Sequence, residues 1–231
     1  MSDSTILTFD QVTLGAQPPY EIGLKDVSFS LGRGDLMTIR IEEILSELPL
    51  ADVAQGLVDP EAGSVQFLGD DWRIMTPDRA ARCRGKIGRV FEAHAWISNL
   101  DVDENVTLSQ RHHTNRPERE ILEEAQALAV QFGLKELSRS RPAVVRHSDL
   151  RRAEWVRAFI GSPPLILLES PKKDVAAEAL PNLMEAVKAA RARGAAVIWI
   201  TGDPKVLSLV APVSKQKFEF RGAALIPWEG K

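Results

Sequence analysis

Acidic side chains follow two apolar runs of the sequence. Residues 164–168 are apolar and end at Glu169, and residues 195–200 are apolar and lead to Asp203. Continuous apolar runs of this length are typical of buried parallel strands, and open α/β sheets collect ligands at the carboxyl ends of such strands. Two carboxylates there could hold a divalent cation. Because no phosphate group completes the ion's shell, we instead expect solvated acids and no metal.

The histidines and the single cysteine form no motif of their own. His112 and His113 are adjacent, so their side chains point to different faces of a helix or strand and do not share a metal. His147 is expected to be exposed. Cys83 has no His–Cys motif beside it, and one cysteine excludes an intramolecular disulfide and a multi-cysteine zinc site.

Aromatic and basic residues give no nucleic-acid signature. We expect Trp96, Trp155 and Trp199 to fill core or subdomain contacts rather than to stack on bases. The formal net charge is -3 with a pI near 5.9, which argues against binding nucleic acid through bulk charge. One basic run is expected to form a solvated face, with an acidic-lipid contact as the alternative: Arg79, Arg82, Arg84, Lys86 and Arg89.

The chain length and hydropathy indicate one α/β domain. Its 231 residues suffice for a sizeable core with a helical insertion. No stretch approaches the ~20 apolar residues that span a bilayer, and the first residues lack the basic and apolar regions of a secretory signal. We therefore expect no direct membrane insertion, so that any membrane association comes through a partner.

The periodicities place these residues on alternating elements. Alternation of apolar and polar residues predicts strands near 6–14, 24–31, 36–41, 63–69 and 87–92, with buried strands at 164–170 and 195–202. Helical patterns cover residues 42–58, with Pro49 as an interruption, and residues 117–134, 148–161 and 179–194. Two further helices are expected, one capped near Thr76 and one that starts at residue 101. The segment KFEFRGAALIP near the end of the sequence alternates and predicts a hairpin. This order predicts an α/β fold with an antiparallel edge.

Four phrases in this order resemble the ATP-binding subunits of ABC transporters. VSFSLGRGD resembles the segment that leads to the family's phosphate-loop strand, and GLVDPEAGSVQFLG resembles the segment after its phosphate-loop helix. KIGRVFEAHAWISNLDVDENV is similar to the Q-loop region. RRAEWVRAFIGSPPLILLESP is similar to the signature helix and the Walker B strand.

The resemblance covers almost the whole chain and implies a definite architecture. It implies an ABC-type P-loop NTPase-like fold as one domain over residues 1–231. An antiparallel β subdomain and a helical signature subdomain at about 93–160 belong to this fold. The RCRGKIGRVF and DENV phrases are most similar to bacterial lipid-trafficking ATPases of the MCE-associated type.

The positions matching the family's catalytic motifs carry other residues. Aligned without gaps, the phosphate-loop lysine falls on Glu47 and the following hydroxyl on Leu48. A carboxylate ~4 Å from a phosphate charge is repelled by ~4 kcal/mol at an effective dielectric near 20. The Q-loop glutamine is matched by Glu92, a signature glycine by His147 and the Walker B aspartate by Glu169. The catalytic glutamate is matched by Ser170 and the switch histidine by Gly202.

These replacements lead us to expect a catalytically inactive subunit with a structural or regulatory role in a membrane transport complex, with lipid transport as the expected process. We expect neither ATP hydrolysis nor a cofactor. One alternative is an ABC ATPase with residual or atypical ATP binding that energises transport. Another is a soluble regulator of an intact ATPase.

The surviving family-like phrases imply where partners bind. In the family, the surface around the Q-loop and the following helix docks the permease. Here that surface would comprise Phe91, Glu92, Trp96, Leu100, Asp101, Asn105 and Val106. The expected partners are a permease-like membrane subunit and a second cassette, in a homodimer or a heterodimer. The expected location is the cytoplasmic face of the cell membrane, as a peripheral subunit.

Overall fold

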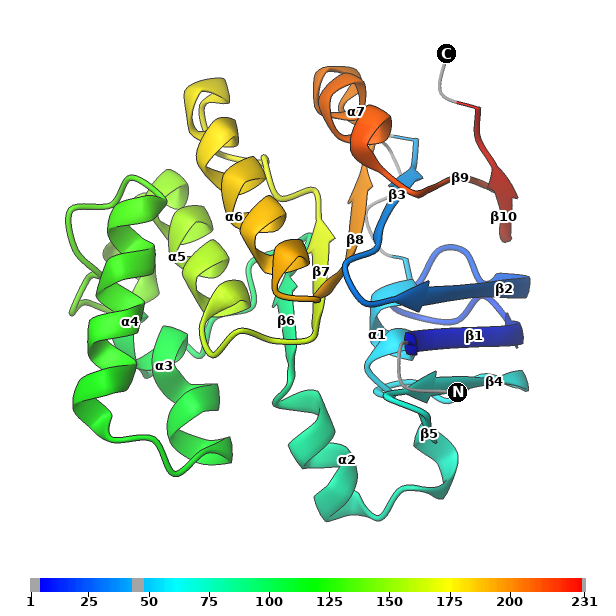
Figure 1. Ribbon diagram of the computed structural model, residues 1–231, viewed down its shortest axis with the longest axis horizontal. Helices are drawn as coiled ribbons and strands as arrows, with labels where there is room; N and C mark the ends of the chain where they lie inside the picture. The colour runs from blue at the N-terminus through cyan, green and yellow to red at the C-terminus, as the bar shows by residue number, and fades with distance from the viewer. Residues whose placement is uncertain (1–4, 43–47, 230–231) are drawn as a thin grey trace.

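The computed structural model describes residues 5–42 and 48–229, which form two sheets and a set of helices (Figure 1). The smaller sheet is antiparallel, with the order β2-β1-β4-β5. Its strands are β1 (Thr5–Leu14), β2 (Leu24–Gly32), β4 (Ala62–Phe67) and the two-residue β5 (Asp70–Asp71). Phe9 and Phe29 are paired across β1 and β2, and their rings stack at 4.6 Å between centroids.

The larger sheet has six strands in the order β10-β9-β3-β8-β7-β6. These are β3 (Leu36–Arg40), β6 (Ile87–Val90), β7 (Leu165–Glu169), β8 (Ala196–Thr201), β9 (Gln216–Arg221) and β10 (Ala224–Pro227). The pairs among β9, β3, β8, β7 and β6 are parallel, and β10 closes the edge as the antiparallel arm of a hairpin. Parallel pairing brings the ends of β3, β7 and β8 to one edge.

Helices cover both faces of this sheet. They are α1 (Leu50–Ala54), α2 (Pro77–Arg84), α3 (Val102–His113), α4 (Glu118–Gln131), α5 (His147–Phe159), α6 (Leu180–Ala192) and α7 (Pro204–Val210). Figure 1 shows α3, α4 and α5 grouped on the side of β6 that lies away from the small sheet. None of the helices in the described ranges is long and apolar enough to cross a membrane.

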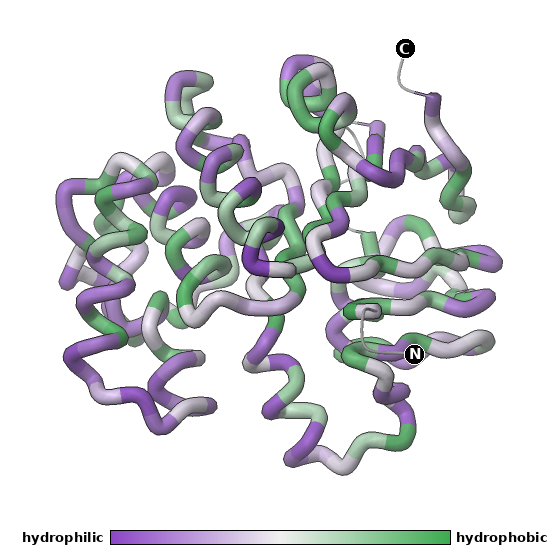
Figure 2. Tube along the Cα trace, in the orientation of Figure 1, coloured by the Kyte–Doolittle hydropathy of each residue, from purple (hydrophilic) through white to green (hydrophobic). Residues whose placement is uncertain are grey.

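Two hydrophobic cores share the strands of the larger sheet. Leu168 and Trp199 face the core built with α3 to α7, whereas Leu167 and Ile198 face the core built with the small sheet and α1. This division follows from the alternation of side chains along a strand. Figure 2 shows the corresponding hydrophobic stretches of the trace in the middle of the molecule.

The sequence predicted most elements within a few residues, and the ABC-type fold class is confirmed below. The predicted helix over 42–58 is the main error. The structure has a helix only from Leu50, with Pro49 at its N-cap position, and it ends at Ala54. Gly56 follows at φ +61°, which lies in the left-handed region. The part of the predicted helix at 43–47 lies outside the described residues.

Candidate functional site

A cavity lies at the carboxyl edge of the larger sheet, where β3, β7 and β8 end. Its volume is about 520 Å³. Loops from neighbouring parallel strands converge at this edge, which is why open α/β sheets bind ligands there. Three positions named from the sequence, Glu92, Ser170 and Gly202, therefore share one cavity. The full lining is Ile41, Glu92, Ser170, Lys172, Lys173, Asp174, Val175, Thr201, Gly202 and Asp203.

Two lysines bring positive charge to this cavity. Lys172 Nζ lies 2.9 Å from Asp203 Oδ2, and Lys173 Nζ lies 3.1 Å from Glu92 Oε1. Partial burial works to raise the pKa of Asp203. Hydrogen bonds from Lys172 and from the backbone N–H groups at the start of α7 outweigh it and lower that pKa. Each lysine can exchange its carboxylate for a ligand anion, so the cavity suits an anionic group.

Glu169 faces an arginine rather than solvent, so the expectation of a solvated strand-end acid is wrong for it. Glu169 is 6% exposed, and its Oε2 lies 2.7 Å from Nε of Arg89. Arg89 also donates to Asp52 at 2.5 Å and to Gln55 at 2.8 Å, and Tyr20 donates to the other oxygen of Asp52 at 2.7 Å.

Arg89 is therefore not part of a solvated basic face. Burial opposes its charge, but the carboxylates of Glu169 and Asp52 outweigh that effect and raise its pKa. The guanidinium thus stays charged and joins α1, β6 and β7. A cation binding to Glu169 would have to displace the hydrogen bond from Arg89.

Comparisons with known proteins agree on one family, although no family model matches the chain. The macrolide export ATP-binding/permease protein MacB of Aggregatibacter actinomycetemcomitans is 26% identical over 184 residues, which is 79% of this chain and 28% of MacB. The lipoprotein-releasing system ATP-binding protein LolD of Idiomarina loihiensis is 25% identical over 84% of this chain and 82% of LolD. The putative hemin import ATP-binding protein HrtA of Staphylococcus haemolyticus is 22% identical over 79% of this chain and 83% of HrtA.

Solved structures show the same fold. The ADP- and Pi-bound dimer of the ATP-binding cassette MJ0796 superposes with a TM-score of 0.82 at 20% identity, over 95% of this chain and 96% of that one. An ATP-binding subunit of an ABC transporter gives a TM-score of 0.79 at 19% identity, over 95% of this chain and 88% of that one. The chain is similar to the ATP-binding subunits of ABC transporters.

These relatives overturn the expectation of a catalytically inactive subunit. They are named as ATP-binding proteins of export, release and import systems, and MJ0796 is described in a post-hydrolysis state. Departures from motif residues had suggested inactivity, but residue types alone do not measure turnover. The ABC-type fold and the ABC relationship predicted from the sequence are confirmed.

The segment corresponding to the ABC phosphate loop is described only in part. Glu47 lies outside the described residues. Leu48 is 6% exposed and packs in the core beside the small sheet, so its side chain does not reach the cavity.

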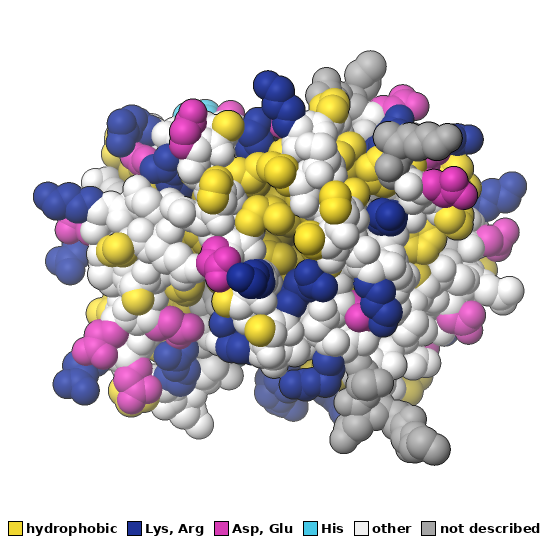
Figure 3. Space-filling model, turned by 45° about the horizontal axis from the view of Figure 1, so that its top comes forward, with side chains coloured by type: hydrophobic (Ala, Val, Ile, Leu, Met, Phe, Trp, Pro, Cys, Tyr) yellow, Lys and Arg dark blue, Asp and Glu magenta, His cyan; other side chains and the backbone are white. Residues whose placement is uncertain are grey.

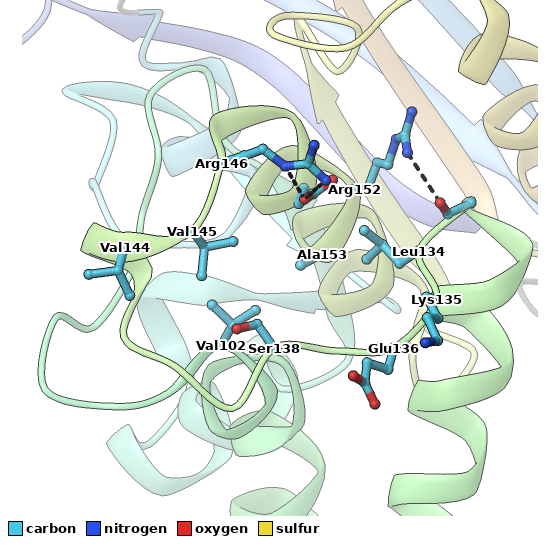
Figure 4. A pocket seen from close by; sticks show the side chains of 12 residues that line it. Val102, Leu134, Lys135, Glu136, Ser138, Val144, Val145, Arg146, Arg152 and Ala153 are labelled. Atoms are coloured by element: carbon cyan, nitrogen blue, oxygen red, sulfur yellow. Dashed lines mark hydrogen bonds and ion pairs between the residues drawn. The ribbon is translucent and has the colours of Figure 1, made fainter.

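The segment corresponding to the ABC signature begins α5. His147 is the first residue of that helix and is exposed. A second cavity, of about 510 Å³, lies between this segment and the end of α4. Figure 4 shows Arg146 turned toward Asp149, at 2.8 Å, and Arg152 turned toward the carbonyl of Gly133, at 3.2 Å. The arginines at this cavity are therefore held by the chain's own oxygens.

The predicted docking surface is only partly available. Val106 is fully buried and Asn105 is 4% exposed, so including these two residues was wrong. The Asn105 side chain accepts from the N–H of Ile97 and donates to the carbonyls of Ile97, Leu100 and Asp101. Asn105 thus holds the loop before α3 rather than contacting a partner.

The remaining docking residues surround a stacked arginine. The Arg157 guanidinium lies 5.4 Å from the ring centre of Phe91 and 4.8 Å from that of Trp96. Leu100 is half-buried, and Asp101 is the N-cap residue of α3, where it forms a capping box with Glu104. Lys173 draws Glu92 toward the cavity at the ends of β3, β7 and β8.

Sequence reasoning missed the polar residues that converge through the fold. Asp52 lies 32 positions after Tyr20, Arg89 lies 37 positions after Asp52, and Glu169 lies 80 positions after Arg89. One signal was available. Arg89 stands between Gly88 and Val90 in the predicted strand at 87–92, and an arginine that a strand buries needs a partner.

Proposed function

We propose that this chain is an ATP-binding subunit of an ABC-type membrane transport complex, with an atypical nucleotide site in the cavity at the ends of β3, β7 and β8. The observation that carries the proposal is the position of that cavity on an ABC-type fold, with Lys172 and Lys173 on its wall. A phosphate group provides stronger, multiple acceptors than the single carboxylate that each lysine now contacts.

Nucleotide titration tests this proposal. Purified chain is titrated with ATP, with and without Mg²⁺, by calorimetry. Lys172→Ala and Lys173→Ala are compared with Lys188→Ala, whose exposed ammonium on α6 pairs with Glu185 at 3.5 Å. We expect binding that the first two changes weaken and the third leaves unchanged. Absence of ATP binding at millimolar concentrations, or equal effects of all three changes, would refute the proposal.

We also propose that the chain works with a permease subunit and pairs with a second cassette. MacB is named as an ATP-binding/permease protein, and MJ0796 is described as a dimer. Figure 3 turns the upper end of the larger sheet toward the viewer and shows hydrophobic side chains gathered among lysines and arginines. An apolar area rimmed by charge is typical of a protein interface. The proposed location is peripheral, on the cytoplasmic face of the membrane.

The proposed permease contact is the exposed part of the surface around Phe91, Trp96 and Leu100. It borders a cleft of about 150 Å³ that includes Phe91, Gln110 and Arg157. Leu100→Glu should release the chain from the membrane fraction of its native cells. Leu122→Glu, on the exposed face of α4, is the matched control. Retention of the Leu100 variant, or equal release of both, would contradict this contact.

The predicted cargo class, a lipid, remains a proposal. LolD is named for lipoprotein release and MacB for macrolide export, so the relatives differ in what they move. Identifying the membrane protein that co-purifies with the chain would test this point.

A further inference from the structure

His94, His147 and Asp174 come together on the surface beside the nucleotide-side cavity. They follow β6, begin α5 and follow β7, respectively, and their potential ligand atoms all lie within 4.8 Å of one another. His94 Nε2 is 3.5 Å from Asp174 Oδ2, and the two imidazole rings cross edge to face at 5.4 Å. We propose that these three side chains bind a divalent transition-metal ion, with zinc as the best fit.

The ligand types decide the class of metal. Two imidazoles and one carboxylate suit zinc and its neighbours in the first transition row, whereas Mg²⁺ and Ca²⁺ need oxygen ligands. Three protein ligands leave the fourth tetrahedral position to water. Ligand atoms around tetrahedral zinc lie roughly 3.3 Å apart. His147 and Asp174 are exposed, so rotation of their side chains can close the remaining distance.

A buried carboxylate orients the first histidine for this role. Glu154 is fully buried, and its Oε1 lies 3.0 Å from Nδ1 of His94. A carboxylate acceptor there keeps the proton on Nδ1 and leaves the lone pair of Nε2 directed at the ion, as carboxylates behind zinc-bound histidines do. Nε2 itself is buried and has no hydrogen-bond partner among the described residues. Such an unpaired atom costs free energy, and a metal bond would satisfy it.

The charges around the site leave Asp174 able to coordinate. Arg151 lies nearest, with its Nη2 3.9 Å from Asp174 Oδ2, which is too far for a hydrogen bond. Its donors are instead directed to Glu154 at 2.7 Å and to the carbonyls of Phe91 and Glu92 at 2.6 and 3.1 Å. Glu154 also lies 3.9 Å from Nη2 of Arg157, so two arginines share its negative charge. The carboxylate of Asp174 therefore supplies the negative charge at the ion itself.

A bound ion would join three segments: the loop after β6, the start of α5 and the turn after β7. Asp174 also lines the nucleotide-side cavity. The ion would therefore fix the helical side of the molecule against the sheet next to that cavity. The site itself does not depend on the proposed function.

Zinc titration of the untagged chain, stripped with EDTA and dialysed, tests the site. His147→Ala and Asp174→Asn are compared with His112→Ala. His112 and His113 form the other pair of touching imidazoles, at 4.7 Å, and serve as a matched control. We expect one zinc ion per chain, weakened at least about tenfold by the first two changes, as loss of even a supporting group weakens metal sites. The His112 variant should bind as the wild type does.

Cobalt provides a second readout, because a tetrahedral Co²⁺ site absorbs visible light intensely. The wild type should show this absorption, and the His147 variant should lose it while unfolding at the same urea concentration as the wild type. No stoichiometric binding of zinc, or binding lost in His112→Ala but kept in His147→Ala, would overturn the proposal.

Discussion

Replacing Arg89 with methionine should destabilise the chain strongly. The Arg89 side chain is 7% exposed and contacts Glu169, Asp52 and Gln55 at 2.7, 2.5 and 2.8 Å. Removing one partner of a buried ion pair costs about 3–5 kcal/mol, because the other charge remains buried without compensation. Arg79→Met is the control. Arg79 pairs with Asp70 at the surface, where its side chain is 55% exposed, and such a pair contributes about 0–1 kcal/mol.

The loss of stability in Arg89→Met should also depend on pH. Burial raises the pKa of Glu169 above its ordinary 4.5, and Arg89 opposes that rise. Without Arg89, burial and the nearby carboxylates of Asp52 and Glu92 all raise the pKa of Glu169, so the folded variant holds the Glu169 proton more tightly than the unfolded chain does. Stability of the variant should therefore be greatest below the unfolded pKa and fall as the pH rises toward the folded pKa.

Urea denaturation at about pH 5 and at about pH 8 measures both effects. Arg89→Met combined with Glu169→Gln should recover much of the loss, because the second change removes the uncompensated charge. If the single variant lies within about 1 kcal/mol of the wild type, or if the second change restores nothing, Arg89 does not compensate Glu169 as argued.

Three further outcomes follow from single contacts. Asn105→Ala should cost about 2–3 kcal/mol in urea denaturation, because four hydrogen bonds between its side chain and backbone groups are lost; a loss below 0.5 kcal/mol would contradict its role in the loop. Gly88→Ala should prevent stable folding, seen as lost soluble yield, because a Cβ would overlap the carbonyl of Ala158. Asp203, whose pKa is lowered, caps α7 and contributes stability above its unfolded pKa that is lost as the pH falls through the folded pKa. Asp203→Asn should therefore flatten the acid limb of a thermal melting profile, and an unchanged limb would refute this.

The strands of the sheet were predictable because the signal for each strand lies in its own residues. The apolar runs that became β7 and β8 need only be buried on both faces, and Thr76 before Pro77 marks the start of α2 within the sequence itself. The helix expected over 42–58 failed because Pro49 sets the first turn, and apolar periodicity does not reveal where a helix begins.

The contacts within the candidate site depend on approach in space. Nothing near Arg89 in the sequence indicates that Glu169 and Asp52 will meet it, and the same holds for His94 and His147, 53 positions apart. The buried role of Asn105 was missed for the same reason, since its hydrogen-bond partners are backbone carbonyls of the loop before α3. The sequence therefore predicted the edge of the sheet at which the cavity lies, but not which side chains neutralise one another there.

Neighbouring residues of β7 belong to different hydrophobic cores, Leu167 to one and Leu168 to the other. A strand cannot leave one core while remaining in the other, since every second side chain is held on the opposite face. The helical half and the β half should consequently melt in a single step, despite their separation in Figure 1. Strain introduced on either side, by a ligand or a neighbouring subunit, must pass through the same few residues of the shared sheet.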